Sequence, residues 1–199
     1  MQMQVVEHVD FSTTAAKRTY QRTALILLSL AVRQTIPHSK VSVEHSLSNG
    51  VYCEIHGKKP LSPRDITRLE QAMRQLVAAA LPITVEEIPK PSATKLLQES
   101  GNASAAMLMD QLDKDPIPLV CCSGSYYYSD GPVLANSALV RHFRLRFYLP
   151  GLILQIPEDH TGKIPQYKEQ PKLASVYRET ERWVSILGIG NAASLNSVI

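Results

Sequence analysis

Histidine and cysteine side chains in one predicted hairpin have types and spacing that could do chemistry. His45 and Cys53 stand on its two arms, and an imidazole beside a thiol can act as base and nucleophile. The same pair also suits a core histidine packed against a small buried thiol, and both interpretations stay open. The spacing Cys53-x-x-His56 occurs in metal sites, but strand residues three apart face opposite sides. The sequence therefore predicts no metal ligand set.

A second segment rich in side chains that could bind a ligand is YYYSDGPVLANSALVRHFRLRF, residues 126–147. It joins three consecutive tyrosines to a Gly-Pro corner and has no obvious nucleophile and only one histidine. Tyr128, Ser129 and Asp130, just before the corner, are candidate ligand-binding residues of a cleft. The sequence leaves open whether this corner is a working site or a former one.

Arg22 is an isolated charge in an otherwise apolar helical segment. A buried guanidinium needs an anionic partner, and Asp130 or Glu54 could provide it. Arg22 could instead clamp a phosphate or carboxylate of a ligand. Both roles make Arg22 a candidate cleft residue.

The segment HFRLRFY, residues 142–148, alternates basic and apolar side chains. The alternation predicts a strand with Phe143, Leu145 and Phe147 on one face and His142, Arg144 and Arg146 on the other. With Tyr126–Tyr128 nearby, the basic face could stack and neutralise RNA. The alternative is an edge strand whose charges keep it soluble, and the net charge of only +3 lends RNA binding little support.

Nucleotide and metalloprotease motifs are absent from the sequence. There is no GxxxxGK[ST], GxGxxG, HExxH or CxxC, and Gly57-Lys58 and Gly162-Lys163 lack the preceding glycine and the hydroxyl residue of a P-loop. No cofactor is predicted for this chain.

The composition is that of an ordinary globular protein, with 199 residues, 44% apolar and 20% charged. Three cysteines, with Cys121 and Cys122 adjacent, suit a reducing compartment. The longest apolar run, Ala24–Leu28, is too short to span a bilayer, and the first residues do not resemble a signal peptide. We expect a soluble, cytoplasmic protein without a membrane partner.

Helices and hairpins must position these residues, and they alternate without a βαβ rhythm, which predicts an α+β fold with an antiparallel sheet and flanking helices. Helices are predicted at 14–36, from Pro63 to Pro82, and as two short pieces at 92–112 hinged at Gly101-Asn102. Strands are predicted at 40–55 (a hairpin), 83–89, 117–122, 142–148 and 151–157. A Pro-rich loop, 157–171, precedes a last helix in which Trp183, with Tyr177 and Val184, belongs to the core or to an interface.

The helix after residue 61 has the clearest start. Ser62 is a good N-cap, Pro63 suits the first helical position, and Asp65 lies where the helix dipole favours a negative charge. Its predicted buried stripe is Ile66, Leu69, Met73, Leu76 and Val77.

The hairpin register is predicted from its turn. A three-residue loop, Ser48–Gly50, would put the apolar side chains on one face, whereas a two-residue loop would mix apolar and charged residues on both. The preferred register places on the inner face Val43, His45, Leu47, Val51, Cys53 and Ile55, with His45 opposite Cys53.

Three segments together resemble the editing domain of threonyl-tRNA synthetases, a fold shared with alanyl-tRNA synthetases. They are RTALILLSLAVRQTIP, GVYCEIHGKKPLSPRDITRLEQAMRQLVAAALPI and SDGPVLANSALVRHFRL. The front part of bacterial uridine kinase-like proteins, which carry this domain ahead of a P-loop kinase, is also similar in EHSLSNGVYCEI and PKLASVYRETERWVSILGIGNAASLN. The resemblance covers about residues 17–199.

The resemblance implies a site made of two histidines one helical turn apart and a cysteine and a histidine four residues apart, with a lysine on an intervening helix. Two imidazoles spaced i, i+4 share one helix face, where they can hold a water or a metal. Aliphatic side chains can neither ligate a metal nor carry a proton. The matching positions here are Arg22, Ile26, Ser129, Val133 and Ala105. The resemblance therefore implies a scaffold whose deacylase chemistry cannot operate, so this chain alone is not expected to be an enzyme.

Three parts of the chain are expected: a lead segment, 1–16, that could be the remnant of a preceding small domain; an editing-domain-like part, 17–157; and a connector with a helix, 158–199, leading to a kinase domain. The chain is expected to be a fragment of a nucleoside (uridine) kinase-like protein that would use ATP and Mg. Its expected function is a ligand-binding, regulatory or interaction module, with the downstream kinase domain or a small ligand as partner. The alternative is an RNA-binding or residual aminoacyl-tRNA deacylase module.

Overall fold

The structure is a computed structural model that describes residues 4–8, 11–47, 50–148 and 150–167. The chain divides into two units, 1–166 and 167–199, and the fold given below is that of the first unit. The predicted last helix with Trp183, Tyr177 and Val184 lies outside the described residues.

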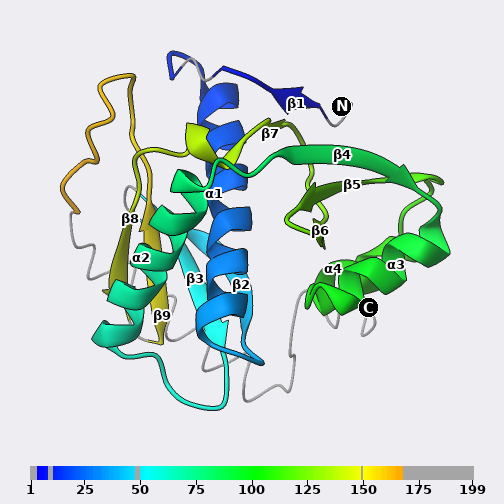
Figure 1. Ribbon diagram of the computed structural model, residues 1–199, viewed down its shortest axis with the longest axis horizontal. Coiled ribbons are helices and arrows are strands. Elements are labelled where there is room, and N and C mark those ends of the chain that lie inside the picture. Colours follow the sequence, from blue (N-terminus) through cyan, green and yellow to red (C-terminus); the bar gives the residue numbers. More distant parts are fainter. Residues whose placement is uncertain (1–3, 9–10, 48–49, 149, 168–199) are drawn as a thin grey trace. The chain divides into compact units, whose positions relative to one another are not determined.

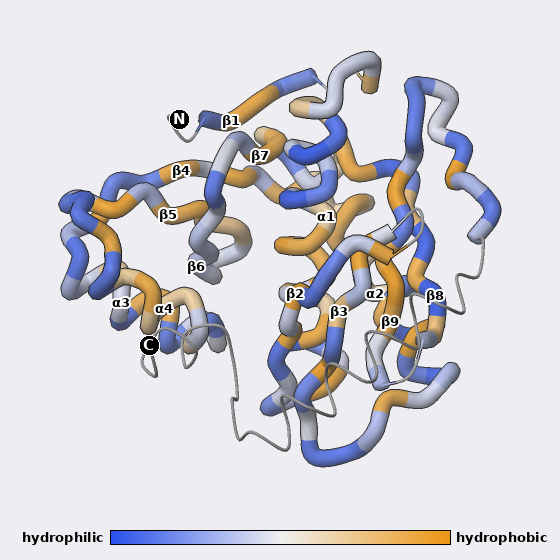
Figure 2. The backbone as a smooth tube through the Cα atoms, turned by 180° about the vertical axis from the view of Figure 1, so that it is seen from behind, coloured by the Kyte–Doolittle hydropathy of each residue, from blue (hydrophilic) through white to orange (hydrophobic). Residues whose placement is uncertain are grey.

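A four-stranded antiparallel sheet forms the larger half of the unit. Its strands are β2 (Lys40–Leu47), β3 (Gly50–His56), β8 (Arg144–Tyr148) and β9 (Gly151–Gln155), in the order β2-β3-β9-β8. Two helices, α1 (Thr14–Thr35) and α2 (Pro63–Ala78), cover one face of this sheet (Figure 1). Most of the apolar colour in Figure 2 lies on α1 and on strands such as β9, and their buried side chains form the main core. The predicted α+β class is confirmed.

A second, three-stranded antiparallel sheet carries the other two helices. It consists of β4 (Ile83–Ile88), β5 (Ile117–Cys122) and β6 (Ser125–Tyr127), next to α3 (Lys90–Glu99) and α4 (Ala103–Met109). Leu97, Met109, Ile117 and Leu119 belong to a separate small core beneath these helices. The break between the helices falls at Gly101, whose φ of 82° is left-handed, as the predicted hinge requires.

A two-stranded parallel pair, β1 (Val5–Val6) with β7 (Val133–Leu134), runs past the N-terminal part of α1, and a 3-10 helix follows at Ser137–Leu139. Neither these two strands nor β6 was predicted from the sequence. Elements of two or three residues are too short to show a periodic pattern.

The start of α2 follows the prediction in detail. Ser62 and Asp65 form a capping box in which each side chain binds the other residue's backbone N–H. Ile66, Leu69, Met73 and Leu76 are buried, whereas Val77 is half-buried.

The hairpin register is wrong in the prediction. Leu47 pairs with Gly50, which leaves a two-residue loop, and His45 pairs with Tyr52 rather than with Cys53. An irregularity between Val43 and His45 interrupts the regular pairing of the two strands. Beyond it the alternation shifts by one residue, so Val43 pairs with Cys53.

Within the described part of the chain, none of the helices has the length and apolar character needed to cross a bilayer.

Candidate functional site

The Gly-Pro corner lies against the N-terminal half of α1. Arg22 Nε donates to Asp130 Oδ1 at 2.6 Å, which confirms the predicted ion pair and selects Asp130 over Glu54. The guanidinium also covers Gly131, where an added Cβ would lie 2.9 Å from Arg22 Cζ. A side chain at this position would push the guanidinium away from the corner.

The two partners differ in exposure. The Arg22 side chain is 19% exposed and the Asp130 side chain 79%. The hydrogen bond from Arg22 lowers the pKa of Asp130, so the carboxylate stays ionised and the pair holds together at neutral pH. The alternative interpretation of Arg22 is a clamp for a phosphate or carboxylate of a ligand. In the structure, the Asp130 carboxylate takes the position of such a ligand group.

Two of the three positions that the resemblance assigns to imidazoles are filled by aliphatic side chains of the main core. Ile26 is 6% exposed and Val133 is fully buried. Between them, the Thr23 hydroxyl accepts a hydrogen bond from the Leu134 backbone N–H at 2.9 Å, which ties β7 to α1. Ala105, the position of the lysine, packs against the small core instead. None of these aliphatic side chains can activate a water.

The remaining candidates of this corner line a small hollow. Ser129 donates its hydroxyl to the Gly131 carbonyl at 2.9 Å, so it stabilises the turn. Tyr128, Ser129 and Asp130 border a cavity of about 160 Å³ together with Lys114. Ligand pockets usually enclose roughly 300–1,000 Å³, so this hollow is below the usual size.

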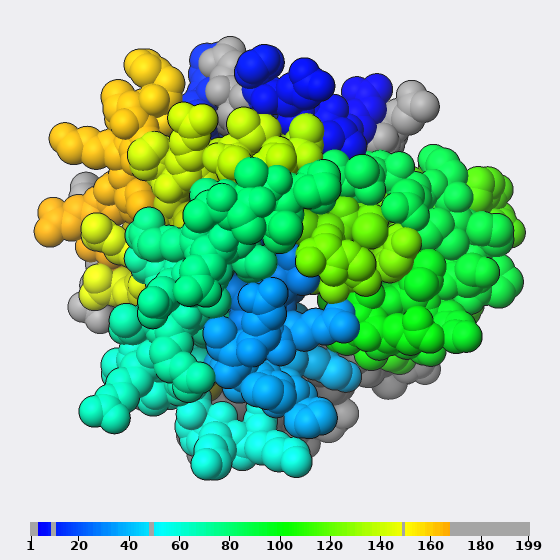
Figure 3. Space-filling view, viewed as in Figure 1, coloured from blue at the N-terminus to red at the C-terminus, as the bar shows by residue number. Residues whose placement is uncertain are grey.

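A narrow opening beyond this corner separates the blue surface of α1 and β2 from the green surface of the second sheet and its helices (Figure 3). Arg33 of α1 bridges to this second part, since its Nη1 donates to Ser125 Oγ at 2.8 Å. Two arginines of α1 thus contact the segment after β5, Arg22 from the N-terminal half of the helix and Arg33 from its last turn.

His45 and Cys53 do not form a nucleophile–base pair. His45 faces the outer side of the sheet and lies against Tyr52, with 5.2 Å between the ring centroids. Its pKa is lowered by burial, although Glu44 and Glu54 act in the opposite direction. Cys53 faces the core, where burial raises its pKa to about 12, so its thiol stays protonated. The register that the irregularity sets accounts for this separation.

The candidate metal ligands also divide between the two faces. Cys53 points to the core and His56 to the outer side, as predicted. Among the described residues, Glu44, Glu54 and His56 bring one ligand atom each to within 4.8 Å of one another and could hold a metal. Exposed carboxylates also gather without an ion, and this cluster by itself does not define a site.

The basic strand has the predicted alternation. Phe143 and Leu145 are buried, whereas His142, Arg144 and Arg146 are exposed. The tyrosines do not join this basic face, because Tyr126 and Tyr127 lie in β6 of the other sheet. The predicted combination of tyrosine stacking with a basic strand is therefore wrong.

Tyr127 is buried in the main core, and Tyr126 donates its hydroxyl to Glu86 at 3.1 Å. These two tyrosines therefore help to build the second sheet, as part of β6.

A basic hollow at the turn between β3 and α2 was not predicted from the sequence. Five basic residues line it: His38, Lys40, His56, Lys58 and Lys59. Only Lys58 and Lys59 are adjacent in sequence, so the one local signal was the short run Gly57-Lys58-Lys59.

Comparison with known proteins shows similarity to threonine–tRNA ligases. The chain is 25% identical to a threonine–tRNA ligase of Symbiobacterium thermophilum over 138 residues, which are 69% of this chain and 21% of that protein. It is 27% identical over 119 residues to the enzyme of Nitratidesulfovibrio vulgaris (60% and 18%) and 28% identical over 123 residues to that of Gloeobacter violaceus (60% and 20%). No family model matches the chain.

The matched region spans about a fifth of the length of these ligases. The chain is thus related to the editing-type domain of a tRNA synthetase, and its α+β fold with antiparallel sheets is consistent with that domain.

Proposed function

We propose that this chain is a catalytically inactive editing-type domain that serves as a ligand-binding, regulatory or interaction module. The observation that carries the proposal is the corner itself: Arg22 is paired with Asp130, and Ile26 and Val133 are buried aliphatic side chains. A hydrolytic site needs a group that moves a proton to or from the attacking water. Ile26 and Val133 carry no such group, and the hydrogen bond from Arg22 lowers the pKa of Asp130, which makes its carboxylate a weaker base.

The test is hydrolysis of threonine tRNA mischarged with serine, with the purified 199-residue chain as the enzyme. We expect serine release at the rate of buffer alone. Serine release above that rate, abolished by heating the protein, would defeat the proposal. A variant with the four groups implied by the resemblance, Arg22→His, Ile26→His, Ser129→Cys and Val133→His, serves as a measure of how much of the scaffold remains usable.

We further propose a nucleoside kinase of the uridine kinase-like kind as the partner that the module serves. Support comes from the similarity of residues 44–55 and 171–196 to such proteins. A GxxxxGK[ST] motif encoded beyond residue 199 would support this part of the proposal, and an unrelated downstream sequence would remove it. If the motif is present, kinase rates with and without residues 1–199 measure the regulatory effect.

RNA binding is a second candidate, favoured by the exposure of Arg144 and Arg146 on the sheet face away from α1 and α2. Filter binding of tRNA at physiological salt tests it. We expect saturable binding that Arg144→Glu with Arg146→Glu weakens, and flat binding would exclude this function.

A further inference from the structure

The basic hollow at the β3–α2 turn has a volume of about 700 Å³. This lies in the range of ordinary ligand pockets. It is bordered by His38 in the loop after α1, by Lys40 at the start of β2, and by the segment from Ile55 to Leu61. A second hollow of about 430 Å³ adjoins the same segment.

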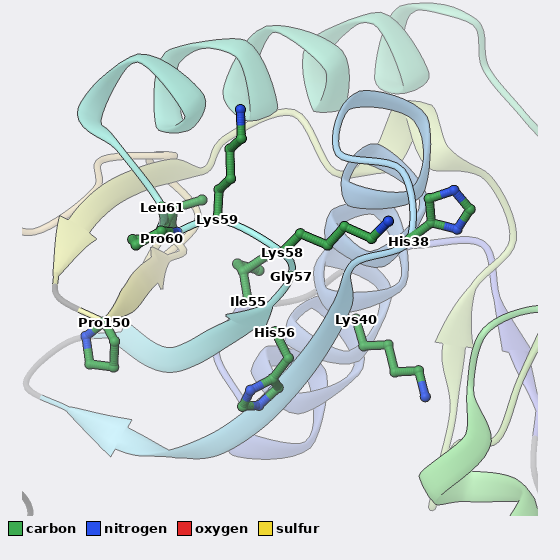
Figure 4. A pocket seen from close by; sticks show the side chains of 10 residues that line it. All are labelled: His38, Lys40, Ile55, His56, Gly57, Lys58, Lys59, Pro60, Leu61 and Pro150. Atoms are coloured by element: carbon green, nitrogen blue, oxygen red, sulfur yellow. The ribbon is translucent and has the colours of Figure 1, made fainter.

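The basic side chains that line this pocket come from separate parts of the chain. Figure 4 shows Lys58 extending toward His38, while Lys40 and His56 project from paired ends of β2 and β3. His38 holds its place with a left-handed backbone, φ 64°, a conformation that histidine adopts more readily than most residues.

Within the described residues, Lys40, Lys58 and Lys59 take part in no ion pair. Nearby carboxylates are already engaged: Glu54 contacts His56 at 3.7 Å, and Asp65 accepts from the Ser62 N–H at 3.0 Å. Three unpaired positive charges at one concave surface attract a multivalent anion.

The rest of the lining is apolar. Ile55, Pro60, Leu61 and Pro150 border the pocket, and Leu61 is buried. A purely ionic ligand would gain nothing from these side chains. A ligand with phosphate groups at one end and an apolar or aromatic part at the other matches both halves of the lining.

We propose that this pocket binds a phosphorylated ligand of the nucleotide class, either a free nucleotide or a nucleotide within an RNA strand. Lys40, Lys58 and Lys59 neutralise its phosphates, and the Ile55–Leu61 segment contacts the base or sugar. The site lies at the turn that joins β3 to α2, apart from the Arg22–Asp130 corner, so it does not depend on the proposed loss of hydrolysis.

The experiment titrates the full 199-residue chain with two probes, ATP and a short single-stranded RNA carrying a 5′-phosphate, by calorimetry and fluorescence anisotropy. We expect saturable binding of at least one probe with a dissociation constant below about 1 mM. Binding of ATP alone identifies a free nucleotide as the source, and binding of the RNA alone identifies a strand.

The decisive variant is Lys58→Glu with Lys59→Glu, which we expect to weaken binding about tenfold or more, since it replaces two charge-assisted contacts by repulsion. For RNA the salt dependence, as log K against log salt, should flatten by about 1.4, the contribution of two phosphate contacts. The matched control, Lys95→Glu with Lys163→Glu, makes the same charge change at two exposed lysines that do not line the pocket.

The control should change the affinity less than about threefold, because distant exposed charges are screened. Two results would overturn the proposal: neither probe saturates, or the pocket variant and the control weaken binding equally. If the charge-reversed protein loses its cooperative melt, Lys58→Gln with Lys59→Gln replaces it, with an expected loss of about threefold to fivefold.

Discussion

The Arg22–Asp130 corner and the β3–α2 turn differ in how their positive charges are paired. At the corner, one guanidinium is closed over a glycine and bound at 2.6 Å to a carboxylate of the same domain. At the turn, three lysines surround a hollow of about 700 Å³ without an ion pair to a described residue. A charge satisfied internally stabilises the fold, whereas unpaired charges around a cavity remain available to a ligand.

The largest expected effect concerns the reactivity of the Cys53 thiol, which is buried in the main core. With a pKa of about 12, the Cys53 thiol is ionised at pH 8 in only about one molecule in ten thousand, against about a quarter for an ordinary thiol. Iodoacetamide should leave Cys53 unmodified in the native protein and label it after unfolding, as read by peptide mass spectrometry. Half-buried Cys121 is the internal reference, and equal native labelling of both would show that the core face is open.

A buried charge at the corner gives the next largest effect. Val133→Asp should lower the free energy of unfolding by more than about 3 kcal/mol, because it puts an unpaired carboxylate into the main core. Val43→Asp is the matched control, since Val43 is a strand valine that is 51% exposed, and it should cost about 1 kcal/mol or less. Urea denaturation measures both, and similar losses would mean that the corner is solvated and could still admit a ligand.

The hydrogen bond that ties β7 to α1 should have an intermediate effect. Thr23→Val keeps the shape of the side chain but leaves the buried Leu134 N–H without its acceptor, at a cost of about 1–3 kcal/mol. The exposed Thr67→Val, on α2, should stay within about 0.5 kcal/mol. A negligible loss for Thr23→Val would indicate that β7 is free to move away from the helix.

The Arg22–Asp130 pair itself should contribute least. Because Asp130 is 79% exposed, solvent screens the pair, and Asp130→Asn should cost less than about 1 kcal/mol at pH 7. The folded-state pKa of Asp130 is lowered, so the contribution is complete above the unfolded-state pKa of about 3.9 and disappears as the pH falls through the folded-state pKa.

The stability difference between wild type and Asp130→Asn should therefore shrink to nothing in acid, as followed by urea denaturation from pH 7 to pH 2. Asp110→Asn, at the exposed end of α4, controls for the loss of a surface carboxylate. A difference that grows toward low pH would contradict the assigned direction.

Much of the fold could be predicted because its signals are local. The cap at Ser62, the apolar stripe of α2 and the hinge at Gly101 each depend on a few neighbouring residues, and each was found where predicted. The ion pair of Arg22 was also predictable in kind, since a guanidinium in an apolar helix must find an anion. The hairpin register was not, because an irregularity near Glu44 has no simple sequence signature and moves His45 to the other face.

The sequence by itself determined that the chain folds as α+β and that isoleucine and valine stand where the resemblance implies imidazoles. Residue types and local periodicity are enough for those conclusions, since they need no knowledge of distant contacts. Only the tertiary structure decided which carboxylate pairs with Arg22, which face His45 occupies, and that Lys40 gathers with Lys58 and Lys59 around one hollow. Such arrangements depend on strand pairing and on how β3 returns to α2, and residues distant in sequence meet there only after the chain has folded.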